Sequence, residues 1–350
     1  MPFFWVHGLL HGRLHGLLHG LVHELVHDRR MSFDFDAAVT APFRMQPGLR
    51  RLAPGAAQLT PLPPGSRHQR EKLAVLSAYP TQALCAVPGF DATPALHALC
   101  AHAASEQAQA WSWDGTTAVA STLGVAVDGA GRVDQRSDGS FRVGVGVGVG
   151  DEIARCLQGL PAPWRLPGLL SLAFAEDFAV VDGHSGCIPW LAVTLPSHWA
   201  PEDKLGRHFT EVHAPVADNA LLLKATASLL RVITSDERWE RFVWNVTDQP
   251  RLHAHPAHGD TRRWQHTAIE QAWWRTERQT FIPVPGGGPN TQQAVFTIAV
   301  NVQRLTDALP TPSHAARLHA AIATMSPAVL AYRNLAGVRD ALLAWLAARA

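Results

Sequence analysis

The pattern of hydrophobic and polar residues late in the chain predicts two extended segments. They are residues 271–283 and 293–302, and the Pro/Gly-rich stretch 285–290 separates them. Two such segments joined by a turn are typical of an antiparallel hairpin. An apolar run at 191–195 predicts a further strand, which we expect to lead directly into a helix.

That helix is predicted over residues 201–213, which carry a short amphipathic pattern. Pro201 suits a first helical position, and Pro215 prevents the helix from continuing. At about 100° per residue the apolar side chains gather on one face, with His208 and His213 on its two flanks. Either imidazole is therefore placed to face a buried cavity, as an axial ligand of a haem does.

Two further stretches, 220–233 and 338–350, have helical periodicity and predict a helix after the histidine segment and a packing helix at the C-terminus. Helices and strands alternate past residue 31 without the strict rhythm of a doubly wound sheet. The predicted fold class is therefore α/β in the broad sense, of the α+β type with an antiparallel sheet. The Val-Gly repeat at 143–150 is too repetitive for a dinucleotide-binding motif and predicts no chemistry.

Composition indicates a soluble, enzyme-sized protein and shows no sign of nucleic-acid binding. The chain has 350 residues, of which 47% are hydrophobic and 17% charged, and its formal net charge is +1. No apolar run approaches the ~20 residues that span a bilayer. The four cysteines are widely spaced without a CxxC pair, which argues against an internal iron–sulfur cluster or zinc site. We therefore expect a cytoplasmic protein that binds neither membranes nor nucleic acid.

The N-terminal segment is repetitive, with a histidine at every fourth position from His7 to His27. Histidines four residues apart on a helix can chelate a metal, but the glycines between them weaken the helix. The repeat ends just before Met31, which resembles an ordinary protein start. We interpret residues 1–30 as a low-complexity extension, disordered or non-native, with metal binding as the alternative. Residues 41–340 contain no Ser/Gly-rich linker or charge run, and residues 31–350 are predicted to form a single domain.

In the first strand of the predicted hairpin, alternate side chains point to the same face. Arg275, Glu277 and Gln279 therefore lie together. One interpretation is a solvated face with an ion pair, and a second is a buried Glu–Arg pair with a structural role. A third is a ligand pocket, in which the cation and the amide donate hydrogen bonds and the carboxylate holds an ammonium group.

Five distinctive sequence blocks are spread in order over residues 41–335. They are Ala41-Pro42-Phe43-Arg44-Met45, Glu176-Asp177, the histidine segment that ends in His213-Ala214-Pro215-Val216, Arg275-Thr276-Glu277-Arg278-Gln279-Thr280, and Thr324-Met325-Ser326-Pro327. Together they resemble the alpha subunit of haem-dependent oxidative N-demethylase. One departure is Val246, which follows Asn245 where the family pattern has a second tryptophan.

The resemblance implies a PAS-like antiparallel sheet whose surrounding helices enclose one b-type haem. His213 is then the axial ligand of the iron and the metal-binding residue, with His208 as the alternative. Arg275, Glu277 and Gln279 are implied as the catalytic residues. Arg275 or Gln279 would donate hydrogen bonds to oxygen at the iron, while the Glu277 carboxylate would hold the substrate ammonium.

The implied reaction is the mono-oxygenation of a small secondary amine such as dimethylamine. Oxygen is activated at iron, a methyl carbon is hydroxylated, and the carbinolamine collapses to formaldehyde and a primary amine. Because the chain shows no paired cysteines and no flavin or nicotinamide motif, a separate reductase must supply the electrons. The resemblance implies partner subunits that carry flavin and an iron–sulfur centre. The alternatives are a PAS-type haem gas sensor, a non-catalytic haem-binding protein, and a generic binding protein with histidines in its core.

Three further residues, Lys204, Arg241 and Asn245, are candidate cofactor contacts. Arg238, Arg241 and Asn245 are interpreted as lying on a helix interleaved with tryptophans. Such arginines either meet the haem propionates or form surface ion pairs.

Two other polar groups are expected to have structural or solvent roles. The acidic pair Glu176-Asp177 follows an apolar run, and we expect structural hydrogen bonds there, with a role in the pocket as the alternative. Four histidines have loose metal-ligand spacing without a cysteine to complete a zinc pattern, so we interpret them as solvent-exposed. They are His253, His255, His258 and His266.

Overall fold

The computed structural model describes residues 33–135, 148–259, 263–265, 267–285 and 292–350. The predictions for the N-terminal repeat, for most of the Val-Gly repeat and for most of the Pro/Gly-rich turn lie outside the described residues. Residues Asp34–Ala350 form one compact unit. None of the helices in the described ranges is long and apolar enough to cross a membrane.

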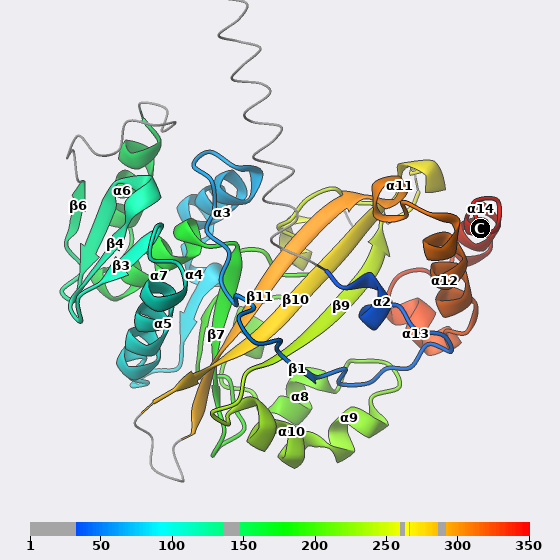
Figure 1. Cartoon of the computed structure of the whole chain (residues 1–350), viewed down its shortest axis with the longest axis horizontal. Helices are drawn as coiled ribbons and strands as arrows, with labels where there is room; N and C mark the ends of the chain where they lie inside the picture. The colour runs from blue at the N-terminus through cyan, green and yellow to red at the C-terminus, as the bar shows by residue number, and fades with distance from the viewer. Residues whose placement is uncertain (1–32, 136–147, 260–262, 266, 286–291) are drawn as a thin grey trace, which may run out of the picture. The chain divides into compact units, whose positions relative to one another are not determined.

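The main sheet has seven strands within the described residues, and every neighbouring pair is antiparallel (Figure 1). In spatial order the strands are β1 (Arg50–Arg51), β9 (Trp239–Thr247), β10 (Trp273–Val284), β11 (Gln293–Arg304), β7 (Glu176–Asp182), β8 (Trp190–Ala192) and β2 (Leu84–Ala86). The predicted hairpin lies at its centre, with Trp273 opposite Arg304 and Val284 opposite Gln293. Both the hairpin and the α+β fold class are confirmed.

A second, four-stranded antiparallel sheet lies in the first half of the described chain. Its strands are β3 (Trp111–Trp113), β4 (Thr117–Ala120), β5 (Val125–Asp128) and β6 (Val133–Gln135). It packs with α5 (Thr93–Glu106), α6 (Val149–Gly159) and α7 (Ala162–Ala173), and α3 (Arg67–Ala78) lies against α6 and α7. The buried rings of Trp111 and Phe174 lie 5.5 Å apart in this core, which continues into β7 and β8 through Phe178 and Trp190. The core therefore joins the two sheets.

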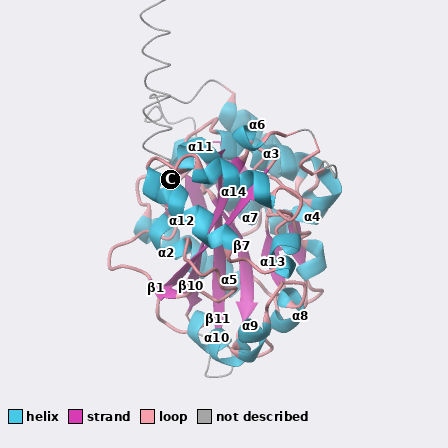
Figure 2. Cartoon of the chain, turned by 90° about the vertical axis from the view of Figure 1, so that its right-hand side faces the viewer, coloured by secondary structure: helices cyan, strands magenta, loops and turns pink. Residues whose placement is uncertain are grey.

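The remaining helices lie around the main sheet. Two follow β8, namely α9 (Ala220–Lys224) and α10 (Thr226–Ile233), and four follow β11, namely α11 (Leu305–Ala308), α12 (Pro312–Ala323), α13 (Pro327–Tyr332) and α14 (Arg339–Ala347). Figure 2 shows α12 and α14 side by side. The short helices are α2 (Phe35–Ala38), α4 (Pro80–Ala83), η1 (Ser121–Leu123), η3 (Pro256–His258) and η4 (Ile269–Gln271). The C-terminal packing helix is confirmed, while the helix predicted over 220–233 is divided at Ala225.

The single helix predicted over residues 201–213 is wrong. The chain forms a 3-10 turn, η2 (Glu202–Lys204), and then a separate helix, α8 (Phe209–His213). Gly206 has a φ of +69°, which interrupts the helix, and His208 is extended and caps α8 with its own side chain. The preceding strand also ends earlier than predicted, at Ala192, so a loop rather than a direct junction leads to this segment.

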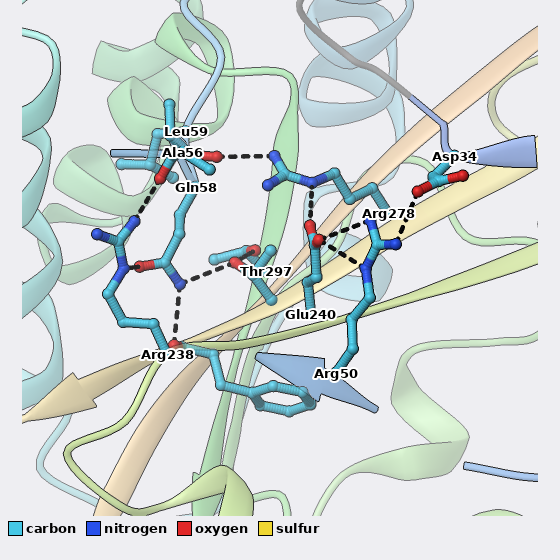
Figure 3. A network of polar contacts seen from close by, with 12 residues as sticks. Asp34, Arg50, Ala56, Gln58, Leu59, Arg238, Glu240, Arg278 and Thr297 are labelled. Atoms are coloured by element: carbon cyan, nitrogen blue, oxygen red, sulfur yellow. Dashed lines mark hydrogen bonds and ion pairs between the residues drawn. The ribbon is translucent and has the colours of Figure 1, made fainter. Parts of the chain in front are cut away.

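One face of the main sheet carries a structural polar network (Figure 3). Glu240 on β9 forms ion pairs with Arg50, at 2.9 Å, and with Arg278 on β10, at 3.0 Å. On the same face Gln58 donates to Thr280 at 3.1 Å and accepts from Arg238 at 2.8 Å. Since side chains alternate along a strand, the odd-numbered positions of β9 and β10 point to the opposite face. That face is free to line a cavity.

Candidate functional site

A cavity of about 360 Å³ lies over the opposite face of the main sheet. Its floor comes from β7, β9, β10 and β11, and its sides come from α8, α9, α10, α13 and the loop after β8. Most of the lining is apolar, including Val181, Leu191, Phe209, Val212, Leu222, Ile233, Val243, Phe281 and Phe296. A cavity with such walls suits a large, mostly apolar ligand with a few polar groups.

The structure brings the predicted polar residues together on the cavity floor. Arg275, Glu277 and Gln279 alternate along β10, while Arg241 and Asn245 come from β9. The register places Gln279 opposite Arg241 and Arg275 opposite Asn245. The helix predicted for the β9 segment is therefore wrong. The segment is rich in aromatic and β-branched residues, which favour an extended strand, and it pairs on both sides.

Glu277 and Gln279 form a hydrogen-bonded pair in the cavity wall. The amide Nε2 of Gln279 donates to Oε2 of Glu277 at 2.6 Å, and the Glu277 residue is only 8% exposed. Burial lowers the pKa of Arg241, and the negative charge of Glu277 opposes that shift. The Nε atom of Arg241 is buried without a hydrogen-bond partner among the described residues. This cluster therefore offers a carboxylate and an unsatisfied cationic donor to a ligand.

Arg275 faces the loops at one end of the cavity. Its Nε donates to Oγ of Ser197 at 2.8 Å, and its two terminal nitrogens donate to the carbonyl oxygens of Arg251, Leu252 and Pro196 at 2.7–3.0 Å. Burial lowers its pKa to about 10, with the charge of Glu277 acting in the opposite direction. Arg275 thus links residues 196–197 to residues 251–252 at this end of the cavity.

His213 lines the cavity from the last position of α8. Its Nδ1 lies 2.7 Å from the carbonyl oxygen of Phe209. A carbonyl only accepts hydrogen bonds, so Nδ1 carries the proton and Nε2 presents a lone pair. Burial lowers the pKa of His213 to about 4, and the charges of Arg241 and Lys204 act in the same direction. The ring is therefore neutral at physiological pH, as a metal ligand must be.

His208, the alternative ligand, has another role in the structure. It caps α8, where its Nδ1 accepts from the backbone N–H of Thr210 at 3.2 Å. The Glu211 carboxylate accepts from the backbone N–H of His208 at 2.9 Å, which completes a capping box. His208 is not among the described residues that line the cavity. The structure thus separates two histidines that the sequence left as alternatives.

Two more predicted contacts lie at the cavity wall. Lys204 donates to the carbonyl oxygen of Val212 at 3.4 Å, and burial lowers the pKa of its amine. Asn245 donates to the carbonyl oxygen of Arg333 at 3.2 Å, while its Oδ1 is buried without a partner among the described residues. Val246 is buried but does not line the cavity, so the departure from the family pattern lies outside this wall.

Sequence analysis missed His198, Tyr332 and Arg333 as cavity residues. The Arg333 guanidinium lies 4.8 Å from the ring centre of Phe43 and 4.7 Å from that of Trp244, and it donates to the carbonyl oxygen of Trp244. Tyr332 is half exposed and lines the cavity from the end of α13. His198 lies in the loop after β8. Tyr332 lies five residues after the C-terminal sequence block Thr324–Pro327, and His198 lies at the start of the histidine segment.

The histidines interpreted as solvent-exposed are instead packed, as far as they are described. The ring of His258 stacks on that of Tyr79 with 3.7 Å between centres, and His253 lies 2.9 Å from His258 between ring nitrogens. His255 is 3% exposed and lies 3.1 Å from the Glu202 carboxylate. The solvent interpretation is therefore wrong for His255, which is buried, while His253 and His258 are partly exposed and held by ring contacts. His266 lies outside the described residues.

The acidic pair at the start of β7 has the expected structural hydrogen bonds. Glu176 accepts from the backbone N–H of Thr60 at 2.9 Å, and burial raises its pKa to about 7. Asp177 accepts from the buried Lys72 at 3.0 Å and from Thr194 at 2.7 Å. Neither acid is among the described residues lining the cavity.

The described residues contain no cluster of three or more His, Cys, Asp or Glu side chains that would hold a metal ion alone. A haem needs only one protein ligand, because the macrocycle supplies the other in-plane donors. A histidine that donates one ring N–H to a backbone carbonyl has the arrangement of a metal ligand. His213, the apolar walls and the buried Arg241 donor therefore fit a haem.

Comparison with known proteins agrees with this chemistry. The family model described as "Haem-dependent oxidative N-demethylase, alpha subunit-like" matches residues 168–343. The chain belongs to this family. The match contains β7 to β11 and α8 to α13, and hence nearly all of the cavity wall. No curated protein sequence matches the chain.

Proposed function

We propose that the cavity binds one b-type haem and that the protein is the haem-carrying component of an oxidative N-demethylase. The observation that carries this proposal is the Nε2 lone pair of His213 at the wall of an apolar cavity, fixed by the bond from Nδ1 to Phe209. Membership of a haem-dependent family supports it. In this proposal the sheet and its surrounding helices act as a PAS-like haem fold.

The cavity residues divide into those that hold the cofactor and those that meet the substrate. His213 is the axial ligand, and the apolar side chains pack on the faces of the macrocycle. Lys204, Arg241 and Asn245 offer polar groups to the two propionates, whose charge favours cationic partners. When bound, the haem supplies oxygen activation for the oxidation of an N-methyl group, which yields formaldehyde and a shortened amine.

Glu277 is the proposed amine-binding residue. A secondary amine of dimethylamine type is protonated at neutral pH, and an unpaired ammonium is costly to bury. Glu277 offers a buried carboxylate to this charge, and Gln279 fixes its orientation through the 2.6 Å hydrogen bond. Arg275 holds the loops at the end of the cavity and contributes positive charge beside Glu277. We propose Arg275, Glu277 and Gln279 as the polar group of the site.

Electrons for the reaction come, in this proposal, from separate components with flavin and an iron–sulfur centre. The alpha-subunit-like character of the family supports other subunits. Turnover with a surrogate reductase, but not with NADPH alone, is expected. Robust turnover of the isolated chain with NADPH alone would contradict this part of the proposal.

The test begins with protein produced with added haem and purified. Its absorption spectrum before and after dithionite is expected to show a histidine-ligated haem. Titration with dimethylamine and other small amines is then expected to shift the Soret band, and formaldehyde release would measure turnover. A protein that retains no haem would refute the proposal, whereas a haem protein that responds to no amine would refute the demethylase assignment alone.

A further inference from the structure

The cavity wall carries a second histidine, His198, whose ring has the opposite tautomer to that of His213. The Nδ1 of His198 lies 3.4 Å from Nη1 of Arg263. A guanidinium donates but does not accept hydrogen bonds, so Nδ1 of His198 is the acceptor and its proton lies on Nε2. His213 thus presents a lone pair at Nε2, whereas His198 presents an N–H.

The N–H of His198 has no partner within the protein. Its Nε2 is buried and makes no hydrogen bond to any described residue, although His198 lines the cavity. A buried donor left unpaired costs free energy, and the great majority of such groups in folded proteins are paired. A bound ligand with an acceptor atom would satisfy this group.

The backbone of His198 is held in a conformation that few side chains adopt. Its φ is +64°, in the left-handed region. Neighbouring contacts enforce it: the backbone N–H of His198 donates to the carbonyl oxygen of Ala254 at 2.9 Å, and Arg275 donates to Oγ of Ser197 at 2.8 Å. Strained residues that the surroundings fix in this way are concentrated at functional sites.

The ring partner of His198 is also fixed. Arg263 forms an ion pair with Asp248 at 2.7 Å and donates to Oγ1 of Thr247 at 3.1 Å. Burial lowers the pKa of His198 to about 3, and the charges of Arg275 and Arg263 act in the same direction. His198 is therefore a neutral hydrogen-bond donor, not an imidazolium.

The two histidines lie near different arginines of the cavity floor. His198 follows Ser197, whose Oγ accepts from Arg275 at 2.8 Å, whereas the charge of Arg241 acts on His213. Arg241 is opposite Gln279, which is four residues from Arg275 on the same strand. At about 3.3 Å per residue, these positions are roughly 13 Å apart along the sheet.

We propose that His198 donates a hydrogen bond from Nε2 to the acceptor atom of a small, electron-rich ligand of the cofactor, dioxygen being the natural candidate. This inference rests on the proposed function, because it assumes that His213 holds the haem. A haem carboxylate has the same acceptor chemistry, and the experiment below distinguishes the two. His198 is then a ligand-contacting residue, and Arg263 is a positioning residue that keeps the proton on Nε2.

The first experiment needs no haem. Nitrogen NMR of the histidine-labelled protein, with assignment by the His198→Gln variant, reports which ring nitrogen carries the proton. The expected result is an Nε2–H tautomer for His198 and an Nδ1–H tautomer for His213 at neutral pH. An Nδ1–H tautomer for His198 would overturn this inference whether or not the protein binds haem.

The second experiment uses the haem-loaded protein with azide and carbon monoxide as probes. His198→Phe keeps a ring but removes the donor, and His198→Gln keeps an N–H near the position of Nε2. We expect azide affinity to fall about tenfold in His198→Phe, the effect of one lost hydrogen bond, and to be largely retained in His198→Gln. The C–O stretching frequency of the carbon monoxide adduct is expected to rise only in His198→Phe. His97→Phe, at an exposed site on α5, is the matched control.

The outcomes separate the alternatives. Unchanged azide affinity and C–O frequency together with lower haem retention in His198→Phe would assign the donor to a haem carboxylate and overturn the proposal. Equal effects in His198→Phe and His198→Gln would indicate a packing role and also overturn it. A wild-type protein that binds no haem would refute the proposed function itself.

Discussion

The Nδ1 of His213 lies 2.7 Å from the carbonyl oxygen of Phe209, one helical turn earlier in α8. This single contact sets the tautomer of the ring and aims Nε2 at the cavity. It depends on α8 starting where it does, and His208 defines that start as the N-cap. The two histidines of the segment thus have complementary roles, one as the cap of the helix and one as the proposed ligand.

The first prediction is that His213→Ala abolishes or greatly weakens haem retention. The substitution removes the only nitrogen that we assign to the iron and leaves the apolar walls in place. Haem content per chain and the Soret band measure the effect, and His97→Ala at an exposed position is the control. An unchanged Soret band in His213→Ala would show that another residue ligates the iron.

The second prediction concerns the pH dependence of stability in the haem-free protein. Folding lowers the pKa of His213 from 6.5 to about 4, so below about pH 6.5 the unfolded chain binds a proton that the folded protein excludes. This contribution is fully favourable above pH 6.5 and is lost as the pH falls toward 4. Burial raises the pKa of Glu176 to about 7, so this residue makes the folded protein more stable as the pH falls, which is the opposite effect. The contribution of His213 is therefore measured as the difference between the wild-type protein and a variant that lacks this histidine.

That measure is urea unfolding of the wild-type protein and of His213→Asn at pH 7 and pH 5. Between these values the wild-type protein should lose about 1–2 kcal/mol more unfolding free energy than the variant. Equal losses in the two proteins would show that His213 is not held neutral in the folded state.

The third prediction is that Arg275→Lys lowers the unfolding free energy by about 2–4 kcal/mol. A lysine ammonium cannot reach Ser197, Arg251 and Leu252 at once, so buried carbonyl oxygens lose their donors. Urea unfolding measures the change. Arg304→Lys at an exposed position should cost less than about 1 kcal/mol. A similar small cost at both positions would contradict the role of Arg275 in holding the loops.

Local patterns predicted the parts of the site that depend on local structure. The segments of β10 and β11 were predicted as strands on either side of a Pro/Gly-rich stretch. Because side chains alternate between the faces of a strand, this placed Arg275, Glu277 and Gln279 on one face. In the segment of β9, aromatic and charged residues occur at both odd-numbered and even-numbered positions. Its identity as a strand depends on pairing with β1 and β10, which a single sequence does not display.

The errors arose where long-range contacts decide the conformation. The left-handed backbone of His198 is held by Ala254 and by Arg275, which binds the neighbouring Ser197, and both lie more than fifty residues away. The split between η2 and α8 depends on Gly206 and on His208 acting as a cap. Histidine is an uncommon N-cap, so this start signal is easily overlooked in the sequence.

The fourth prediction is that deleting residues 1–30 leaves solubility and haem content unchanged. The glycines weaken a helix in the histidine repeat, and we propose that the haem domain lies within residues 31–350. The measurement compares haem per chain and thermal unfolding of the full chain and the shortened chain. Loss of folding on deletion would refute the proposed domain boundary.

The last prediction is that Glu277→Gln weakens amine binding about 10- to 100-fold while haem content stays the same. The substitution removes the charge that pairs with an ammonium, but the amide keeps the shape of the side chain and its oxygen still accepts from Gln279. Amine-induced shifts of the Soret band measure affinity, and Glu270→Gln at an exposed position is the matched control. A neutral ligand of similar size should bind the wild-type protein and Glu277→Gln alike, because it has no charge for the carboxylate to meet. Unchanged amine affinity in Glu277→Gln would therefore refute the assignment of Glu277 as the amine-binding residue without affecting that of His213.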